Sequence, residues 1–252
     1  VRPAGGDLFP SARLALADAL ARAGELAEAE RALAAPLAAD PADVRLVTMR
    51  ASVLDRAGRT PDAIALLRRA IDDAARSAER DVADLHVALA EILVRAGRAP
   101  DAVTALRGAL AARPRNEELL YALGSAYERA GQGEVAAAQM RALLAVNPDH
   151  AEAMNFLGYA YAEQGVRLEE AERLVRRALE LKPRSGHVLD SLGWVLYRRG
   201  DHRGAVEILE QAASIAGPDS TIEEHLGDAY RAAARLGDAA QAYRRALGSV
   251  GD

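Results

Sequence analysis

The stretch LDSLGWVLYRRG, Leu189–Gly200, followed by GAVEILEQAA, Gly204–Ala213, decides the fold because its pattern recurs along the chain. In both segments the apolar residues return at intervals of three and four positions, which is the period of an amphipathic helix. Glycine between two such segments marks the turn at which the first helix ends. We therefore expect a hairpin of two helices.

Seven variants of the second segment follow one another, namely AEAERAL, DAIALLRRAI, DAVTALRGAL, VAAAQMRALL, EAERLVRRAL, GAVEILEQAA and DAAQAYRRAL. The small residue near the start of each recurs after 34, 39, 34, 35, 34 and 34 residues, at Ala29, Ala63, Ala102, Ala136, Ala171, Ala205 and Ala239. A proline often follows, at Pro41, Pro114, Pro148 and Pro183, and proline cannot continue a helix. The sequence therefore predicts helix, glycine turn, helix and proline stop, repeated seven times.

This pattern resembles the tetratricopeptide repeat (TPR) family over about residues 10–248. The resemblance implies an all-α fold, a right-handed α-α superhelix (TPR solenoid) of about seven helix-turn-helix repeats whose first helices line a concave groove. Stacked hairpins bury apolar faces that one hairpin alone leaves exposed. The small residues of the second segments, together with Gly124, Gly158, Gly193 and Gly227, are expected to let helices approach closely.

The expected organisation is an N-terminal arm over 1–9, repeats one and two over 10–82 with an insertion near 72–82, and repeats three to seven over 83–252. Because of the insertion, we interpret the chain as two lobes joined there, with a lengthened helix in an unbroken superhelix as the alternative. Pro36 should kink the second helix of the first repeat or delay its start. Ala234 stands where the other repeats have their turn glycine.

Composition argues against several kinds of function. The net charge is −5 without a basic stripe, so we expect no nucleic-acid binding. The chain has no cysteine, and no pair of its five histidines has the spacing of a helix-borne metal site. Asp190 and Asp228 could approach each other across neighbouring helices, but an open, wet groove disfavours the pKa shifts of acid–base catalysis. We predict a non-enzyme with no catalytic residues, no metal and no cofactor.

Helical angle separates a packing face from a candidate binding face. At about 100° per residue, Leu189, Leu192 and Leu196 share the face that packs inside the repeat, and Trp194 and Tyr197 lie on a second face. The candidate groove residues are Tyr121, Asn155, Tyr159, His187, Asp190, Trp194, Tyr197, Arg198, His225, Asp228 and Arg231. Aromatic rings beside arginine are typical of binding hot spots. In the alternative, Trp194 and Tyr197 pack between neighbouring first helices and expose only an edge. His187 and His225 are expected to be solvated.

The block from Asn155 to Tyr243, with an extra residue after Gly165, resembles TPR lipoproteins of bacterial outer membranes. Some relatives of this type bring substrates to a carboxyl-terminal processing protease. The resemblance implies a periplasmic, lipid-anchored adaptor for a protein or peptide, in a protease or envelope complex, with membrane contact only through the lipid. The chain opens VRPAGGDLFP without methionine, so we expect it to be a piece of a longer product whose anchor lies upstream. A pilus or secretin assembly factor and a cytosolic TPR regulator remain alternatives.

Overall fold

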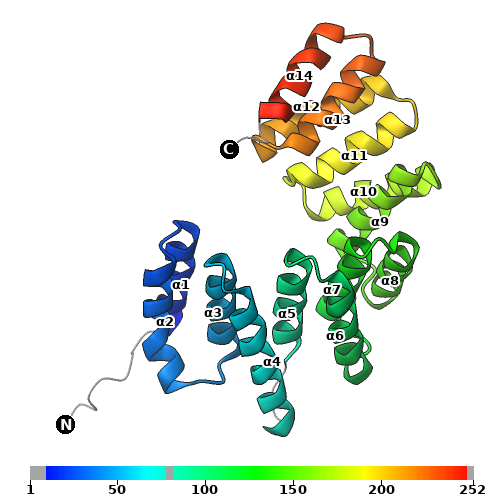
Figure 1. Cartoon of the computed structure of the whole chain (residues 1–252). Helices are drawn as coiled ribbons and strands as arrows, with labels where there is room; N and C mark the ends of the chain where they lie inside the picture. The colour runs from blue at the N-terminus through cyan, green and yellow to red at the C-terminus, as the bar shows by residue number, and fades with distance from the viewer. Residues whose placement is uncertain (1–9, 78–81, 249–252) are drawn as a thin grey trace. The chain divides into compact units, whose positions relative to one another are not determined.

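The computed structural model describes residues 10–77 and 82–248, and in these residues every regular element is an α-helix. The predicted N-terminal arm, 1–9, lies outside the described residues. The helices are α1 (Pro10–Arg22), α2 (Leu26–Ala39), α3 (Val44–Arg56), α4 (Thr60–Ser77), α5 (Ala83–Arg95), α6 (Ala99–Ala112), α7 (Glu117–Arg129), α8 (Gly133–Val146), α9 (Ala151–Gln164), α10 (Leu168–Leu181), α11 (Gly186–Arg198), α12 (His202–Ala216), α13 (Ser220–Ala232) and α14 (Leu236–Gly248). The two helices of each predicted hairpin are consecutive in this order, which confirms the all-α, seven-hairpin fold (Figure 1).

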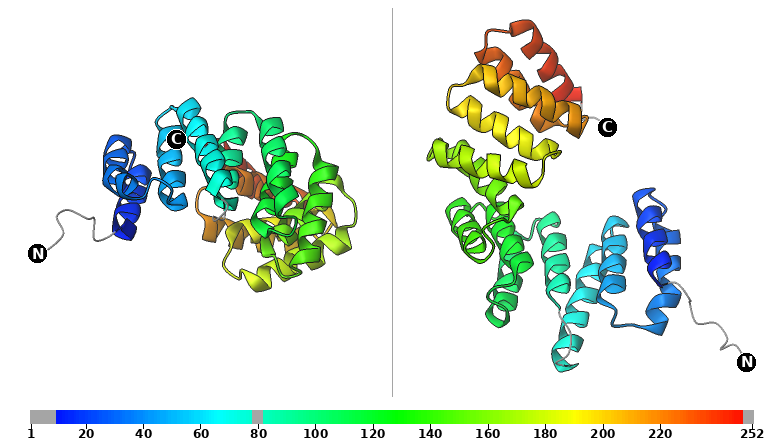
Figure 2. Two further views of the ribbon diagram at one scale, coloured as in Figure 1. Left: turned by 90° about the horizontal axis from the view of Figure 1, so that it is seen from below. Right: turned by 180° about the vertical axis from the view of Figure 1, so that it is seen from behind.

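The chain divides into two compact units, unit 1 up to Ala136 and unit 2 from Ala137 onward. In unit 1, α1 packs on α2, α3 on α4 and α5 on α6, and each first helix also contacts the first helix of the next hairpin. Unit 2 has the same arrangement in its hairpins α9–α10, α11–α12 and α13–α14 (Figure 2). Within each unit the hairpins therefore stack in sequence order, as a solenoid requires.

The insertion is accommodated by a longer second helix. Helix α4 has 18 residues, against 13 to 15 in the other helices. Both α3 and α4 contact α5, and a single apolar cluster runs from Val47 to Ala126. The two lobes expected to meet at 72–82 are therefore not found, because the core continues past the insertion and the division into units lies at Ala136. Part of the insertion, residues 78–81, is outside the described residues.

Pro36 lies inside α2, but the prediction that it delays the start of this helix is wrong. Helix α2 begins at Leu26, two residues after the turn glycine, as α4 does after Gly58. Its helical conformation continues through the buried Pro36 to Ala39. Proline is tolerated here because it lies near the end of the helix, and its carbonyl still accepts a hydrogen bond of 2.9 Å from the Asp40 amide.

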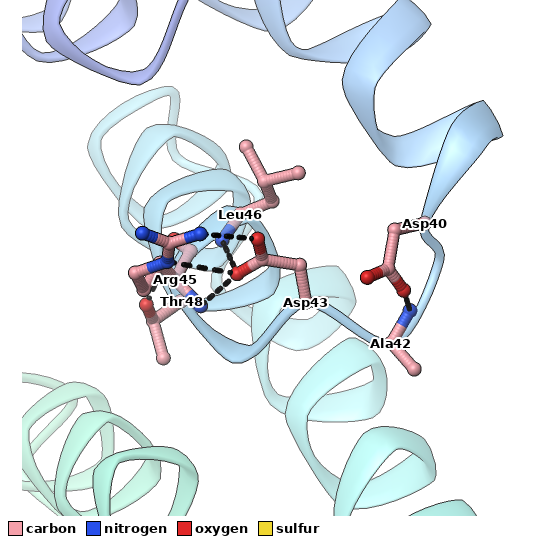
Figure 3. Close-up of polar contacts among 6 residues, drawn as sticks. All are labelled: Asp40, Ala42, Asp43, Arg45, Leu46 and Thr48. Carbon is pink, nitrogen blue, oxygen red and sulfur yellow. Dashed lines mark hydrogen bonds and ion pairs between the residues drawn. The ribbon is translucent and has the colours of Figure 1, made fainter. Parts of the chain in front are cut away.

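The start of α3 shows how side chains fix a helix boundary. The Asp43 carboxylate accepts hydrogen bonds from the backbone amides of Arg45 and Leu46, at 2.9 and 3.4 Å, and from the Arg45 guanidinium (Figure 3). These bonds satisfy amides that have no partner within the helix. The hydrogen bond from the Arg45 side chain is the largest influence on the Asp43 carboxyl and, against the opposing effect of burial, leaves its pKa lowered.

Each hairpin turn has a left-handed residue at the same position, and the turn between α9 and α10 has a second one, Arg167, with φ 49°. At the shared position the residue is glycine in six hairpins, with φ from 68° at Gly165 to 87° at Gly200, and it is Ala234 with φ 60° in the last. The following amide donates back to the helix in the same way in both kinds of turn, as Asp201 does to Leu196 at 3.0 Å and Arg235 to Tyr230 at 2.8 Å. Ala234 therefore adopts a backbone conformation that is favourable for glycine and strained for alanine.

Replacing Ala234 with glycine should therefore stabilise unit 2. Relief of the left-handed strain, about 1–2 kcal/mol, exceeds the entropy that glycine adds to the unfolded chain, about 0.4–1 kcal/mol. We expect a net gain of about 0.5–1 kcal/mol, measured by thermal unfolding. Ala240→Gly, on the exposed side of α14, is the control and should lower stability by about 1 kcal/mol. A lower melting temperature for Ala234→Gly would contradict this account of the turn.

Candidate functional site

Three successive first helices, α9, α11 and α13, form one side of unit 2, which we call the first-helix face. Helix α11 contacts both α9 and α13. The helices approach the second helices closely because glycine occupies their packing side. A Cβ built on Gly193 would lie 2.5 Å from Leu209 Cγ, and one on Gly227 would lie 2.6 Å from the Tyr243 ring. The predicted role of these glycines is confirmed, and it leaves the opposite side of each first helix for other side chains.

Trp194 is half-buried and its ring is covered from two directions. Its ring stacks with that of Tyr197 on the same helix, at 4.9 Å between centroids and 16° between planes. It also stacks with the His225 ring on α13, at 4.3 Å and 17°. The indole N–H donates to Glu163 Oε1 on α9 at 2.5 Å. Trp194 thus links all three first helices, as in the alternative in which it packs between them.

Asp190 and His225 form a buried pair across α11 and α13. Each residue is only 7% exposed, and His225 Nδ1 lies 2.9 Å from Asp190 Oδ1. The expectation that His225 is solvated is therefore wrong, and Asp190 is likewise buried rather than displayed. The physical reason is that a carboxylate and an imidazole one repeat apart satisfy each other, which makes the burial of both groups tolerable. The two residues are buried below the surface of the first-helix face, where the His225 ring packs against Trp194.

Arg198 and Tyr159 flank this stack. The Arg198 guanidinium carbon lies 5.7 Å from the centroid of the Trp194 ring, and the guanidinium donates to the backbone carbonyl of Glu163 at 2.9 Å. The ring of Tyr159 on α9 lies 6.2 Å from that of His225 on α13. Side chains two repeats apart therefore approach each other on the first-helix face.

The remaining predicted residues of α13 extend the face. Asp228 accepts hydrogen bonds from Arg231 at 3.0 Å and from the Tyr243 hydroxyl at 2.6 Å. Burial, followed by this bond to Asp228, raises the pKa of Tyr243 to about 12. Asp228 is therefore paired with Arg231 and Tyr243, while Asp190 is paired with His225.

Three other predicted residues lie on α11, α9 and α7. His187 is exposed in the first turn of α11. Asn155 on α9 is half-buried, and its Oδ1 atom is buried without a hydrogen-bond partner among the described residues. Tyr121 lies on α7, in unit 1.

Sequence reasoning missed two features. One is Glu163, which binds both Trp194 and Arg198. The other is a hollow of about 560 Å³ between α3 and α5 in unit 1, with Met49, Ser52, Ala88 and Ile92 among its lining residues. The signal for the hollow is the residue six positions before the turn glycine, which is Ser52 in α3 but Tyr159 in α9 and Trp194 in α11.

The described residues contain no group of three or more side chains able to hold a metal ion. None of the helices in residues 10–77 and 82–248 combines the length and apolar character of a membrane span. The chemistry gathered on the first-helix face is that of rings, ion pairs and hydrogen bonds, which suits recognition of another polypeptide.

A family model for the tetratricopeptide repeat matches residues 14–79, 48–117, 87–138, 121–186 and 191–252. The chain belongs to the tetratricopeptide repeat family. TPR proteins generally mediate protein–protein interaction and are typically non-catalytic scaffolds.

Several solved structures share the fold of this chain. A tetratricopeptide repeat protein from Parabacteroides merdae aligns with a TM-score of 0.66 and 19% identity, covering 94% of this chain and 91% of its own. The thermophilic TPR protein TTC0263 of Thermus thermophilus aligns with a TM-score of 0.58 and 25% identity, over 66% of this chain and 91% of its own. The Cut9-Hcn1 structure of the APC/C aligns with a TM-score of 0.70 and 16% identity, over 98% of this chain and 48% of the other.

One curated relative is the TPR repeat-containing protein PA4667 of Pseudomonas aeruginosa. It is 37% identical over 67 residues, which cover 27% of this chain and only 11% of the relative. The similarity to this relative is therefore confined to a short part of its length.

Proposed function

We propose that this TPR chain is a non-catalytic adaptor that binds a peptide segment or a partner protein at the first-helix face of unit 2. The observation that carries the proposal is the continuous cluster of Tyr159, Trp194, Tyr197 and His225, contributed by three successive first helices. Tyr159, Trp194 and Tyr197 are half-buried and can contact a partner. Because their neighbours hold these rings rigidly, they lose little conformational entropy on binding, which favours them as anchors.

Polar and charged groups at the border of this cluster would orient the partner. His187 and Glu224 are exposed on α11 and α13, and Arg231 is exposed beside Asp228. Such groups select partners and their register more than they add affinity. Asp190 and His225, being buried, would hold the Trp194 ring in place without touching the partner directly.

We further propose that the adaptor works in the bacterial cell envelope, anchored by a lipid to the outer membrane and facing the periplasm, where it presents substrates to a processing protease. The support is the resemblance of the block from Asn155 to Tyr243 to outer-membrane TPR lipoproteins. We expect the coding sequence upstream of Val1 to encode a signal peptide followed directly by a cysteine that receives the lipid. Cell fractionation that recovers the protein only with the cytosol would contradict the envelope location.

Site-specific photocrosslinking in the native organism tests the binding face. A photoreactive side chain placed at Glu224 should yield a covalent adduct with a discrete partner, identified by mass spectrometry. The matched control is Gln241, which is equally an exposed position but lies on the second helix α14. Adducts from Gln241 and none from Glu224 or His187 would contradict the assignment of the first-helix face.

A further inference from the structure

A tyrosine, an arginine and a carboxylate meet beside the last hairpin. The Tyr230 hydroxyl donates to Glu210 Oε1 at 2.8 Å, and Arg235 donates to the same oxygen at 3.3 Å. The Arg235 guanidinium lies 4.4 Å from the Tyr230 ring centroid and also binds Asp238 at 2.7 Å. Burial, followed by the bond to Glu210, raises the pKa of Tyr230 to about 12. At this place in the repeat, one carboxylate therefore accepts hydrogen bonds from both a phenol and a guanidinium.

The same positions two repeats earlier carry the same groups except the carboxylate. Tyr161 lies four residues before its turn glycine, as Tyr230 lies four before Ala234. Arg167 and Glu170 correspond to Arg235 and Asp238, because each pair lies four and one residues before the small residue of its second helix. The third group comes from the second helix of the preceding hairpin, five residues after the small residue of that helix. Near Tyr230 it is Glu210, five residues after Ala205, whereas near Tyr161 it is Arg141, five residues after Ala136. An arginine thus stands where the twin arrangement has its acid.

The two arginines converge on one oxygen. Arg141 donates to the Tyr161 hydroxyl oxygen at 3.1 Å and Arg167 donates to it at 3.5 Å. The Arg167 guanidinium lies 5.4 Å from the Tyr161 ring centroid. Glu170 Oε2, at 3.7 Å from Arg167, is the only carboxylate within ion-pair distance of either arginine among the described residues. Among the described residues, Arg167 therefore has one distant carboxylate partner and Arg141 has none.

The phenol itself has an unused hydrogen. The Tyr161 hydroxyl accepts from both arginines, and its own O–H has no acceptor among the residues that the structure describes. Tyr161 is only 4% exposed, while both arginines are exposed to solvent. The Tyr161 hydroxyl and the two guanidiniums therefore form a set of hydrogen-bond donors that has no anion bound between them.

We infer that Arg141, Tyr161 and Arg167 form a binding site for a carboxylate, supplied by an acidic side chain of a protein partner. The twin site holds a carboxylate with one arginine, so the earlier site, with two, has the stronger attraction for the same group. The site is built from Arg141 on α8, Tyr161 near the end of α9 and Arg167 in the turn before α10. None of the three belongs to the cluster of rings on the first-helix face, so the site adds a separate point of recognition.

Acetate is the probe, and the side-chain Nε–H signals of arginine in the NMR spectrum of the whole chain are the measurement. At constant ionic strength, adding acetate should shift the signals of Arg141 and Arg167, while the signal of Arg203, exposed on α12, should not follow. In Arg141→Gln the affinity for acetate, measured from the titration of the Arg167 signal, should fall about tenfold. Equal shifts of all exposed arginines, or a response to phosphate with none to acetate, would overturn the carboxylate site.

Arg141→Glu gives an independent test because it rebuilds the twin arrangement. The new carboxylate should accept the bonds of Tyr161 and Arg167, abolish the response of Arg167 to acetate and raise the melting temperature of unit 2. Arg141→Gln is the matched control, since it removes the cation without supplying an acid. If Arg141→Glu lowers the melting temperature and leaves the response to acetate intact, the equivalence of the two sites is wrong.

Discussion

Gly158→Ala should strongly destabilise unit 2. A Cβ at this position would lie 3.0 Å from the Ala171 carbonyl oxygen and would overlap Val175 Cγ2, both on α10. A side chain can turn aside, but the backbone of a packed helix can move only if the whole hairpin opens. We expect a loss of about 3 kcal/mol, or a fall of about 10 °C in the melting temperature of unit 2.

The fluorescence of Trp194 reports this change, because Trp194 is the single tryptophan of the chain and lies in unit 2. The control is Gly237→Ala on α14, in the same unit, where an added Cβ meets nothing within 4 Å. That change should be neutral or stabilise by up to about 1 kcal/mol. Equal melting temperatures for the two variants would show that α9 and α10 are not in tight backbone contact.

Trp194→Ala should produce the second large effect. The variant loses ring contacts with both Tyr197 and His225, and it leaves the Glu163 carboxylate without the indole donor. For a half-buried ring we expect a loss of about 2–3 kcal/mol in the free energy of unfolding. Affinity for the partner should also fall, because the neighbouring rings lose the support that holds them. Helical circular dichroism below the transition should change little.

Trp194→Phe separates the two contributions of this residue. Phenylalanine retains an aromatic ring for stacking but cannot donate to Glu163, so it should recover most of the stability, within about 1 kcal/mol of the original chain. Circular dichroism is the readout here, since the variant lacks tryptophan fluorescence. Unchanged stability of Trp194→Ala, together with lost partner binding, would mean that the ring is displayed to the partner rather than packed between helices.

Features that depend on one position per repeat could be predicted from the sequence. The turn glycines, the close approach at Gly158 and Gly193, and the substitution at Ala234 each follow from a local rule applied seven times. The accommodation of the insertion was harder to predict, because extra residues lengthen a helix or open a loop with similar ease. Helix α4 continues to Ser77. No proline follows it, whereas one lies two residues after the end of each of α2, α6, α8 and α10.

The depth of side chains on the first-helix face could not be predicted in the same way. Helical angle gives the direction of Trp194, whereas its exposure depends on which residue the next repeat places against it, and that residue is His225. The pairing of Asp190 with His225 had a usable signal, since an acid and a histidine stand 35 residues apart, one full repeat. Applied along the chain, a search for complementary residues one period apart would find this pair.

The approach of Tyr159 to His225 has a consequence for how unit 2 unfolds. In an ideal linear array each hairpin is coupled only to its immediate neighbours, so the terminal hairpin can fray while the others persist. Here a side chain of α9 meets one of α13 across the intervening α11, at 6.2 Å between ring centroids. Loosening of the last hairpin is therefore felt two hairpins away, and the three should melt as a single cooperative block instead of peeling from the end.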